Sequence, residues 1–386
     1  MKQETREQIR AEFAHLDSLY FNTAYLGPTP LCAKKKVIES LSRELNPSFY
    51  SYDNWIGNSD KLRVQLAELL NCSPDHIGHA ASVSDINNTI ANGMSFNQED
   101  VVCAIDKDYP SNVLPWMLRS QHKDGPQFKL LSLGKERAVS AEWLKHNLPA
   151  STKVFCISWV AFDTGTKIDI ISIGKMLRER EILFVLDGTQ GLGGLALTAQ
   201  ELELVDVFTC ATYKWLLGAY GHAFAYFSSL ALKKIQHTSA NWVTSVNSKN
   251  VYSLLDYTTE TLPGARKYDR GQTSNMLSLS CLSASLELYA QLGLSCIQNY
   301  NSKIRDHFLS NFPKNKYTLI TPSEAMGNII GLKSCAMDPV ALEQQLKNHN
   351  IDVSVRQGNV RLSFHFFNTQ EQVNQLLTTL DSVNSF

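Results

Sequence analysis

The amino-acid sequence predicts an α/β fold in which a large, doubly wound, mostly parallel sheet domain is followed by a smaller α+β domain. Short apolar runs of strand length alternate with helical patterns through most of the chain. After about residue 262 the pattern changes to one long helical stretch and then short strands and helices. With 386 residues and 44% hydrophobic content, the chain can bury a large core and is expected to form two unequal domains.

The predicted elements follow one another in a clear order. An amphipathic helix at 59–70 and a helix at about 85–94 precede the sheet. Largely apolar segments that we interpret as strands lie at 101–105, 128–133, 154–160, 182–186, 205–210 (interrupted by Asp206) and 223–227, and the run 182–186 is continuous, as is typical of a buried strand. Further helices are expected at 171–181, 274–292, 338–349 and from 369 onward, with later strands at 329–333 and 359–364. We expect an N-terminal arm (1–20) packing on the small domain, a large domain (21–262) and a small C-terminal domain (263–386).

Two residues at strand ends suggest a cofactor. Asp187 closes the run 182–186, so its carboxylate is expected at the carboxyl end of a buried parallel strand, where open α/β sheets bind ligands. Lys214 lies just beyond the run 205–210 and should reach the same crevice. Pyridoxal 5'-phosphate needs a lysine amine to hold its aldehyde and a carboxylate against its ring nitrogen. We therefore predict this cofactor, with Lys214 as the catalytic residue, Asp187 as the ring partner and Gln190 within reach of the ring.

Other interpretations of these segments exist. A lone aspartate at a strand end is often a turn or cap residue, and a lone lysine after a strand is usually solvated. The segment 191–196, GLGGLA, also satisfies the dinucleotide-binding pattern G-x-G-x-x-G/A. However, Thr198 and Glu201 form a capping-box pattern, so the next helix should begin after the glycines and would not point its first turn at a pyrophosphate.

Composition excludes several function classes. The formal net charge is −1, so the sequence has no basic footprint for nucleic acid or an anionic membrane. The first ten residues are too charged for a signal peptide, and no apolar run is long enough to span a bilayer. The eight cysteines lack the paired spacing of a zinc site or a disulfide framework. We expect a cytoplasmic protein with reduced thiols, no metal and no nucleic-acid or membrane partner.

Several short motifs occur in a specific order. They are Tyr20–Ala24 with Gly27 and Pro28, the turn 82–88, Asp108–Asn112 ahead of Pro115 and Trp116, the segment VLDGTQG (185–191), Tyr213–Gly218, Arg270–Asn275, and Val360–Ser363 before Phe367–Thr369. Together they resemble the class V aminotransferase family of fold-type I pyridoxal-phosphate enzymes. This group includes cysteine desulfurases, isopenicillin N epimerase-like proteins and related lyases.

The resemblance assigns roles around the cofactor. Val83 and Ser84, at the start of a helix, match the phosphate-binding turn, where free N–H groups and a hydroxyl can hold the dianion. For Ser84 the simpler role of helix cap is compatible with this one. Tyr109 matches the ring that stacks on the pyridine; an ordinary half-buried tyrosine is the alternative. Gln190 would hydrogen-bond the phenolic oxygen.

Further positions follow from the same resemblance. Thr212 and Tyr213, next to Lys214, match cofactor-binding positions. Thr273 and Asn275 match a segment that reaches the phosphate of the neighbouring subunit, which implies a homodimer with shared active sites.

On the substrate side, Arg361 matches the family's arginine for the substrate carboxylate, and a guanidinium suits that role through two parallel hydrogen bonds. A salt bridge between domains is the alternative role for this arginine. Arg356 is a second candidate. Tyr25, with Tyr109 and Phe162, suggests an aromatic-lined substrate pocket, although such residues equally suit a core.

Departures from the desulfurase pattern narrow the function. The segment 353–359 is short and has no thiol, so persulfide chemistry is not expected. The family's phosphate-binding serine is replaced by Ala211, which leaves Thr212 as a substitute. Phe162 replaces an asparagine, and Tyr213 replaces the histidine before the lysine. These changes favour the epimerase-like and lyase-like branch.

The expected activity is that of a class V aminotransferase acting on an amino acid through an external aldimine and a quinonoid. Freed Lys214 would act as base on the α-proton while Arg361 orients the carboxylate. A C–S lyase (β-elimination) and an amino-acid epimerase remain alternatives, because the same carbanion leads to each outcome. A non-catalytic cofactor-binding sensor is a further alternative.

Overall fold

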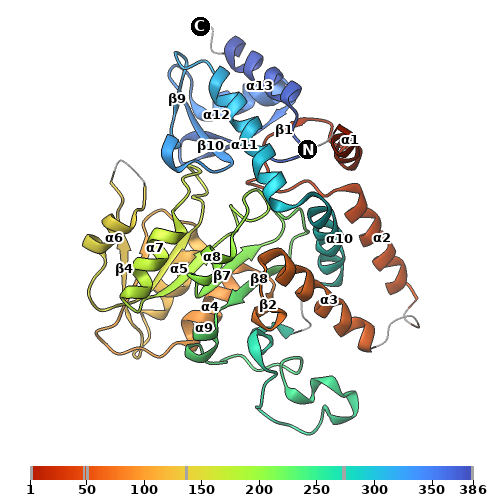
Figure 1. The fold of residues 1–386 in the computed structure, drawn as a ribbon, viewed down its shortest axis with the longest axis vertical. Helices are drawn as coiled ribbons and strands as arrows, with labels where there is room; N and C mark the ends of the chain where they lie inside the picture. Colours follow the sequence, from red (N-terminus) through yellow and green to blue (C-terminus); the bar gives the residue numbers. More distant parts are fainter. Residues whose placement is uncertain (1–2, 47, 49–51, 135–137, 272–274, 384–386) are drawn as a thin grey trace.

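The computed structural model describes residues 3–46, 48, 52–134, 138–271 and 275–383. Its larger part is built on a mixed seven-stranded sheet, and a smaller antiparallel sheet lies above it in Figure 1. In spatial order the large sheet consists of β2 (Ile77–Ala80), β8 (Ala223–Phe227), β7 (Val207–Ala211), β6 (Leu183–Asp187), β5 (Thr152–Ser158), β3 (Val101–Ile105) and β4 (Gln127–Leu131).

Most strands of the large sheet run parallel, as the sequence predicts. The five strands from β7 to β4 are parallel, whereas β8 is antiparallel to β7 and β2 is antiparallel to β8. The six predicted runs form strands within two residues at either end. The seventh strand, β2, was not predicted, because its four residues IGHA include a glycine and a histidine and give no apolar run.

Helices cover both faces of the large sheet (Figure 1). One face packs on apolar residues of α3, α7 and α10, and the other on those of α4, α5 and α9. The helices of this part are α2 (Leu31–Glu44), α3 (Tyr52–Leu70), α4 (Val83–Gly93), α5 (Pro110–Arg119), α6 (Ala141–Asn147), α7 (Ile170–Glu179), α8 (Ala199–Glu203), α9 (Ser229–Lys234) and α10 (Met276–Leu292). No helix within the described ranges is both long and apolar enough to cross a membrane.

The smaller sheet has the strand order β12-β13-β10-β9, and every neighbouring pair is antiparallel. Its strands are β9 (Tyr317–Leu319), β10 (Ile329–Ser334), β12 (Ser354–Arg356) and β13 (Asn359–Ser363). The accompanying helices are α11 (Leu294–Asn311), α12 (Pro339–Asn348) and α13 (Gln370–Val383). The α+β character predicted for this region is therefore confirmed.

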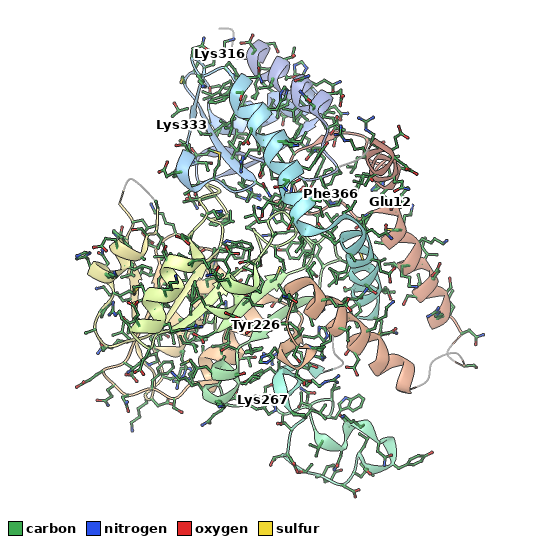
Figure 2. All side chains as sticks on the ribbon, viewed as in Figure 1. Glu12, Tyr226, Lys267, Lys316, Lys333 and Phe366 are labelled. Carbon is green, nitrogen blue, oxygen red and sulfur yellow. The ribbon has the colours of Figure 1, made fainter. Side chains whose placement is uncertain are left out.

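The N-terminal segment joins the smaller sheet to the rest. After α1 (Gln3–Glu12), strand β1 (Leu19–Tyr20) pairs in parallel with β11 (Ile351–Asp352). Ile9 and Phe13 of α1 pack with Phe366, which lies near the junction of the two parts in Figure 2. The domain boundaries 1–20, 21–262 and 263–386 remain a prediction. The packing of α10 against α2 and α3 favours a start of the small domain later than residue 263.

Two helices begin or end at residues other than those predicted, and local backbone features explain both differences. The predicted helix at 85–94 begins earlier, at Val83, because the Ser82 side chain accepts the Asp85 N–H. The predicted stretch 274–292 is followed by a second helix, since Gly293 adopts φ 76° and breaks the chain direction between α10 and α11.

A buried ion pair fixes α3 beneath the edge of the large sheet. Arg63 Nη2 lies 2.5 Å from Asp269 Oδ2, and both side chains are buried. Arg63 also donates to the Ile77 carbonyl, and the His79 N–H donates to Asp269 over 2.7 Å. Strand β2 is therefore anchored by charge as well as by ladder hydrogen bonds.

We predict that Arg63→Ala lowers the free energy of unfolding by about 3–5 kcal/mol, because it leaves the Asp269 carboxylate buried without its cation. Lys61→Ala is the matched control on the same helix. Lys61 pairs with Glu287 over 3.1 Å at an exposed position, so its loss should cost less than about 1 kcal/mol. Chemical denaturation midpoints measure both, and equal shifts would contradict the prediction.

Candidate active site

A cavity of about 280 Å³ opens at the carboxyl ends of the central parallel strands. It brings together predicted site residues from four separate parts of the chain. Its lining consists of Ala81, Ser82, Val83, Ser84, Tyr109, Ser111, Ser158, Phe162, Asp187, Thr189, Gln190, Ala211, Tyr213, Lys214, Tyr220, Gly221 and His222. The predicted crevice at the Asp187 and Lys214 strand ends is thus present.

Asp187 is the last residue of β6 and is buried. Its Oδ1 accepts the Thr189 N–H over 2.9 Å, and its Oδ2 accepts an N–H of Asn112 Nδ2 over 3.3 Å. Burial raises the pKa of Asp187, whereas these hydrogen bonds and the charge of Lys214 act in the opposite direction. The carboxylate is held in one orientation inside the cavity and suits a protonated ring nitrogen.

Lys214 follows β7 in a tight turn and is only 6% exposed. Its Nζ lies 5.1 Å from the centre of the Tyr109 ring and 5.6 Å from that of Tyr213. Burial lowers the pKa of Lys214 to about 8, and the positive charge of Arg361 adds to this effect while Asp187 opposes it. Near neutral pH the neutral form of this amine, which nucleophilic attack on an aldehyde requires, is therefore far more populated than for an exposed lysine.

The first turn of α4 forms one end of the cavity. Ser82 is the cap of this helix, so Ser84 lies in the first turn and its hydroxyl is not the cap. Ser84 Oγ is 2.8 Å from Ser111 Oγ, and both serines line the cavity next to Val83. Free N–H groups and hydroxyls at a helix N-terminus suit a phosphate dianion.

Four aromatic rings surround the lysine. Tyr109 is 36% exposed and meets Phe162 edge to face, with ring centres 5.5 Å apart. Tyr213 stacks on Tyr220 with centres 4.1 Å apart. Tyr109 is thus a cavity-wall residue and is not buried in the core, which agrees with the stacking role that the resemblance implies.

Two predicted cofactor contacts have other partners here. Gln190 lines the cavity, but its Nε2 donates to the Ala24 carbonyl over 3.0 Å and its Oε1 accepts from Trp215 Nε1 over 2.9 Å. Thr212 is fully buried and does not line the cavity; its hydroxyl donates to the His222 carbonyl over 3.0 Å. The hydroxyl missing at Ala211 is therefore not replaced by Thr212 in this arrangement.

Arg361 lies on β13, next to the cavity residue Phe162, and is 2% exposed. Its Nη1 donates to the Phe162 carbonyl over 2.6 Å, whereas Nε and Nη2 have no hydrogen-bond partner among the described residues. Burial and the charge of Arg356 lower the pKa of Arg361, and the charge of Asp163 raises it. The guanidinium nevertheless stays charged at neutral pH. Two unpartnered nitrogens of a buried guanidinium, Nε and Nη2, suit a carboxylate.

The remaining predicted residues lie at the edges of the site. Tyr25 is 51% exposed, and its ring lies 5.6 Å below the Arg356 guanidinium. Asn275 caps α10, with its Oδ1 accepting the Leu277 N–H over 2.9 Å, and is exposed. Thr273 lies outside the described residues. The proposed reach of this segment to a neighbouring subunit remains a prediction.

Sequence reasoning missed a polar chain behind Asp187. Asn112 Nδ2 also donates to Ser158 Oγ over 3.0 Å, and Ser158 Oγ donates to Asp108 over 2.6 Å. Burial raises the pKa of Asp108 to about 6. Ser158 ends β5, next to the strand of Asp187, and this polar strand end was a signal that could have found it. His222, at the start of β8, gave no such signal, because its place depends on the antiparallel pairing of β8.

The glycines of segment 191–196 have a packing role. A Cβ on Gly191 would lie 2.3 Å from the Trp159 ring, and one on Gly194 would lie 2.6 Å from the Trp215 ring. Helix α8 begins only at Ala199, behind the predicted capping box of Thr198 and Glu201. The segment makes room for two tryptophans and does not form a dinucleotide-binding helix start.

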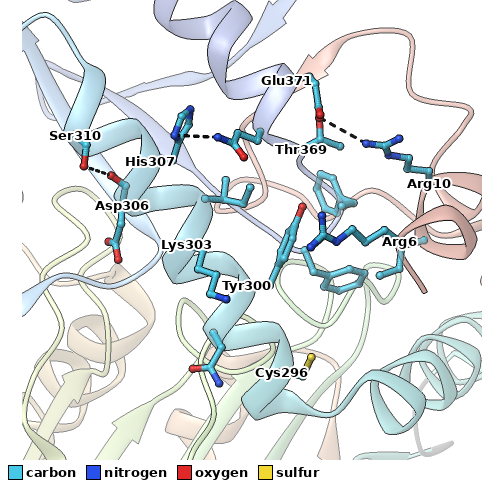
Figure 3. A pocket seen from close by; sticks show the side chains of 16 residues that line it. Arg6, Arg10, Cys296, Tyr300, Lys303, Asp306, His307, Ser310, Thr369 and Glu371 are labelled. Carbon is cyan, nitrogen blue, oxygen red and sulfur yellow. Dashed lines mark hydrogen bonds and ion pairs between the residues drawn. The ribbon is translucent and has the colours of Figure 1, made fainter. Parts of the chain in front are cut away.

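A larger hollow of about 840 Å³ lies between α1, α11 and the start of α13 (Figure 3). Arg10 and Glu371 form an ion pair across it, with N and O 3.6 Å apart. Arg6, Lys303 and Tyr300 also line it. None of the predicted site residues does, so this hollow is separate from the Lys214 cavity.

The Lys214 cavity fits pyridoxal phosphate. The buried amine, the oriented carboxylate of Asp187 and the first turn of α4 supply a partner for the aldehyde, the ring nitrogen and the phosphate respectively. Together with the sheet order, they define a pyridoxal-phosphate enzyme of fold type I.

Comparisons with known proteins agree. The chain belongs to the aminotransferase class-V family, whose model matches residues 54–376. It is 23% identical to a probable cysteine desulfurase of Methanothermobacter thermautotrophicus over 98% of both chains. It is also 23% identical to isopenicillin N epimerase of Streptomyces clavuligerus over 83% of each chain. The family resemblance seen in the motifs is therefore confirmed.

Solved structures show the same fold. The apo cysteine desulfurase of Thermococcus onnurineus superposes with a TM-score of 0.85 at 17% identity, covering 98% of both chains. The cystine C-S lyase C-DES in complex with cysteine persulfide gives 0.87 at 19% identity, over 96% of this chain and 99% of that one.

The lowered pKa of Lys214 predicts a distinctive reactivity in the cofactor-free protein. Because the neutral amine is the reactive form, acetylation of Lys214 by a small anhydride should rise with pH and reach half its plateau near pH 8. Exposed Lys233 serves as the reference. Mass spectrometry of both peptides measures the two profiles, and parallel profiles for the two lysines would contradict the assignment.

Proposed function

We propose that the protein is a pyridoxal-phosphate enzyme that acts on an amino acid, with class V aminotransferase chemistry as its principal activity. The observation that carries this proposal is the placement of Lys214 and Asp187 in one cavity, with an amine whose pKa is lowered to about 8. When bound, the cofactor supplies an electron sink for charge that develops at the substrate's α-carbon.

The residues of the chain supply binding and proton transfer. The unpartnered Nε and Nη2 of Arg361 would hold the α-carboxylate, which orients the Cα–H bond. The Lys214 amine, once released from the cofactor, would take the α-proton. Delivery of that proton by Lys214 to the carbon derived from the cofactor's aldehyde would give transamination, whereas a proton delivered by a second donor to the opposite face of the α-carbon would give epimerisation. Loss of a β-substituent would instead make the protein a C–S lyase.

Persulfide chemistry of the desulfurase type does not fit the chain. Strands β12 and β13 are joined by the two-residue turn Gln357–Gly358, and this hairpin has no thiol. The turn is too short to carry a mobile cysteine loop. The desulfurase names among the relatives therefore do not transfer to this protein.

The active sites are proposed to be shared in a homodimer. Ala211 supplies no hydroxyl, and Thr212 does not line the cavity and donates its hydroxyl to the His222 carbonyl, so neither position adds a hydroxyl to the phosphate end. Thr273 and Asn275 of a second copy would complete it, as the family resemblance implies. Sedimentation at micromolar concentrations would detect the dimer.

The cofactor assignment predicts that the purified protein, mixed with pyridoxal phosphate, gives the visible absorption band of a lysine-bound cofactor. Lys214→Ala should remove this band and reduce turnover by several orders of magnitude, because base and anchor are lost together. Lys233→Ala, at an exposed site, should leave both unchanged. Normal turnover of amino acids by the Lys214→Ala protein would refute the assignment.

Arg361→Lys tests the substrate side. A lysine cannot make the two parallel hydrogen bonds of a guanidinium, so KM for the amino acid should rise roughly 10- to 100-fold. The cofactor band should persist, because Arg361 does not line the cofactor cavity. Product analysis for keto acid, racemised amino acid or released thiol, run on the wild-type protein, separates the three reaction outcomes. An unchanged KM in Arg361→Lys would contradict the proposed carboxylate site.

A further inference from the structure

A second arginine shares a sheet face with Arg361. In the hairpin of β12 and β13, Ser354 lies opposite Arg361 and Arg356 lies opposite Asn359. Opposed residues of an antiparallel pair point to the same face, and so do alternate residues along a strand. The four side chains therefore share one face, and Arg356 and Arg361 are diagonal neighbours.

The turn between these strands fixes that register. Gln357 and Gly358 have φ values of 48° and 76°, so both lie in the left-handed region that a two-residue hairpin turn of this kind requires. A slip of one residue between the two strands would place the two arginines on opposite faces of the hairpin. The placement of the two arginines on one face of the hairpin is thus set by the backbone.

Arg356 has little within the described part of the chain to offset its charge. Its Nη1 donates to the carbonyl of its neighbour Val355 over 2.7 Å, and its guanidinium lies over the Tyr25 ring. Among the described residues no ion pair joins it to a carboxylate. The Glu343 carboxylate accepts the Val355 N–H over 3.1 Å. Side chains alternate along a strand, so the Val355 side chain lies on the face of β12 opposite to that of Arg356.

The Arg356 charge also acts on the residues of the site. Burial is the main cause of the lowered pKa of Lys214 and of Arg361, and the charge of Arg356 adds to it in both cases. The Tyr25 phenol beneath it raises the pKa of Tyr213 and of Tyr220, and both of these tyrosines line the cavity. Tyr25 follows Ala24, whose carbonyl accepts from the cavity residue Gln190, so Tyr25 and the Arg356 guanidinium over its ring lie beside the cavity.

Unpartnered polar atoms lie between the two arginines. Ser354 is 4% exposed and its Oγ has no hydrogen-bond partner in the described ranges, as is also true of Arg361 Nε and Nη2. Buried donors without partners cost free energy unless a ligand satisfies them. Two like charges on one face raise that cost further. A ligand with one anionic group at Arg361 would leave the Arg356 charge without a counter-charge. A ligand with two anionic groups would neutralise both arginines.

We propose that Arg356, supported on Tyr25, binds a second negative charge of the substrate, so that the preferred substrates are amino acids whose side chain carries a carboxylate or another oxyanion. Diagonal neighbours on a sheet are roughly 7–8 Å apart, and this spacing is within reach of one short acidic amino acid held at both ends. The inference rests on the proposed function and adds the substrate class to it.

The test compares acids with their amides in the protein reconstituted with pyridoxal phosphate. For the wild type, kcat/KM should be at least about tenfold higher for aspartate or glutamate than for asparagine or glutamine. Arg356→Gln should remove that preference by raising KM for the acids, while values for the amides change less than about threefold. Arg356→Lys, which keeps the charge, should retain part of the preference. Lys333→Gln removes an exposed positive charge from β10 of the same sheet and should leave the preference intact.

A binding measurement tests the second anion site at Arg356 without depending on catalytic turnover. Calorimetry should show glutarate binding the wild-type protein at least about tenfold more tightly than its monoamide, with the difference lost in Arg356→Gln. An acid preference that survives Arg356→Gln, or a wild type that does not discriminate in either measurement, would overturn the inference. If the protein forms no cofactor band, the proposed function is refuted instead. The comparison of glutarate with its monoamide still decides whether Arg356 binds a second anionic group.

Discussion

The cost of burying charge in and beside one crevice is the constraint on which the rest of the structure depends. Lys214, Asp187 and Arg361 are each less than 7% exposed, and each would lose hydration without a partner. The unfavourable burial is offset in a different way for each of the three side chains. Asp187 is held by Thr189 and Asn112, the pKa of Lys214 falls to about 8, and Arg361 keeps two of its nitrogens unpaired. A site in this state is prepared for a ligand that carries complementary charge.

The sheet order brings these groups together. Strands β6 and β7 are parallel neighbours, so Asp187 and the turn that carries Lys214 emerge at the same edge. The N-terminal segment closes over that turn. The Gly27 N–H donates to the Tyr213 carbonyl over 2.9 Å, and a Cβ on Gly27 would lie 2.0 Å from the Lys214 carbonyl oxygen. Arg361 arrives from the smaller sheet, which is tied to the same N-terminal segment through β1 and β11.

The central part of this arrangement could be predicted from the sequence. Apolar runs identified six of the seven strands, and the polar residues at their ends identified Asp187 and Lys214, because strand ends of a parallel sheet meet at one edge. What it could not supply depends on tertiary contacts. Thr212 was a reasonable substitute for a missing serine, but strand pairing turns its hydroxyl toward His222. Gln190 was expected at the cofactor, and its amide is engaged by Ala24 and Trp215, which are remote in sequence. Arg356 became a strong candidate only when the β12–β13 register placed it beside Arg361.

The central claim is that Lys214 is the residue that holds the cofactor. Reduction of the reconstituted protein with borohydride, followed by proteolysis and mass spectrometry, locates the covalent adduct directly. The account predicts one principal pyridoxyl-phosphate adduct, on the peptide that contains Lys214. An adduct spread over exposed lysines, or the absence of any adduct on Lys214 in protein that has taken up the cofactor, would contradict it.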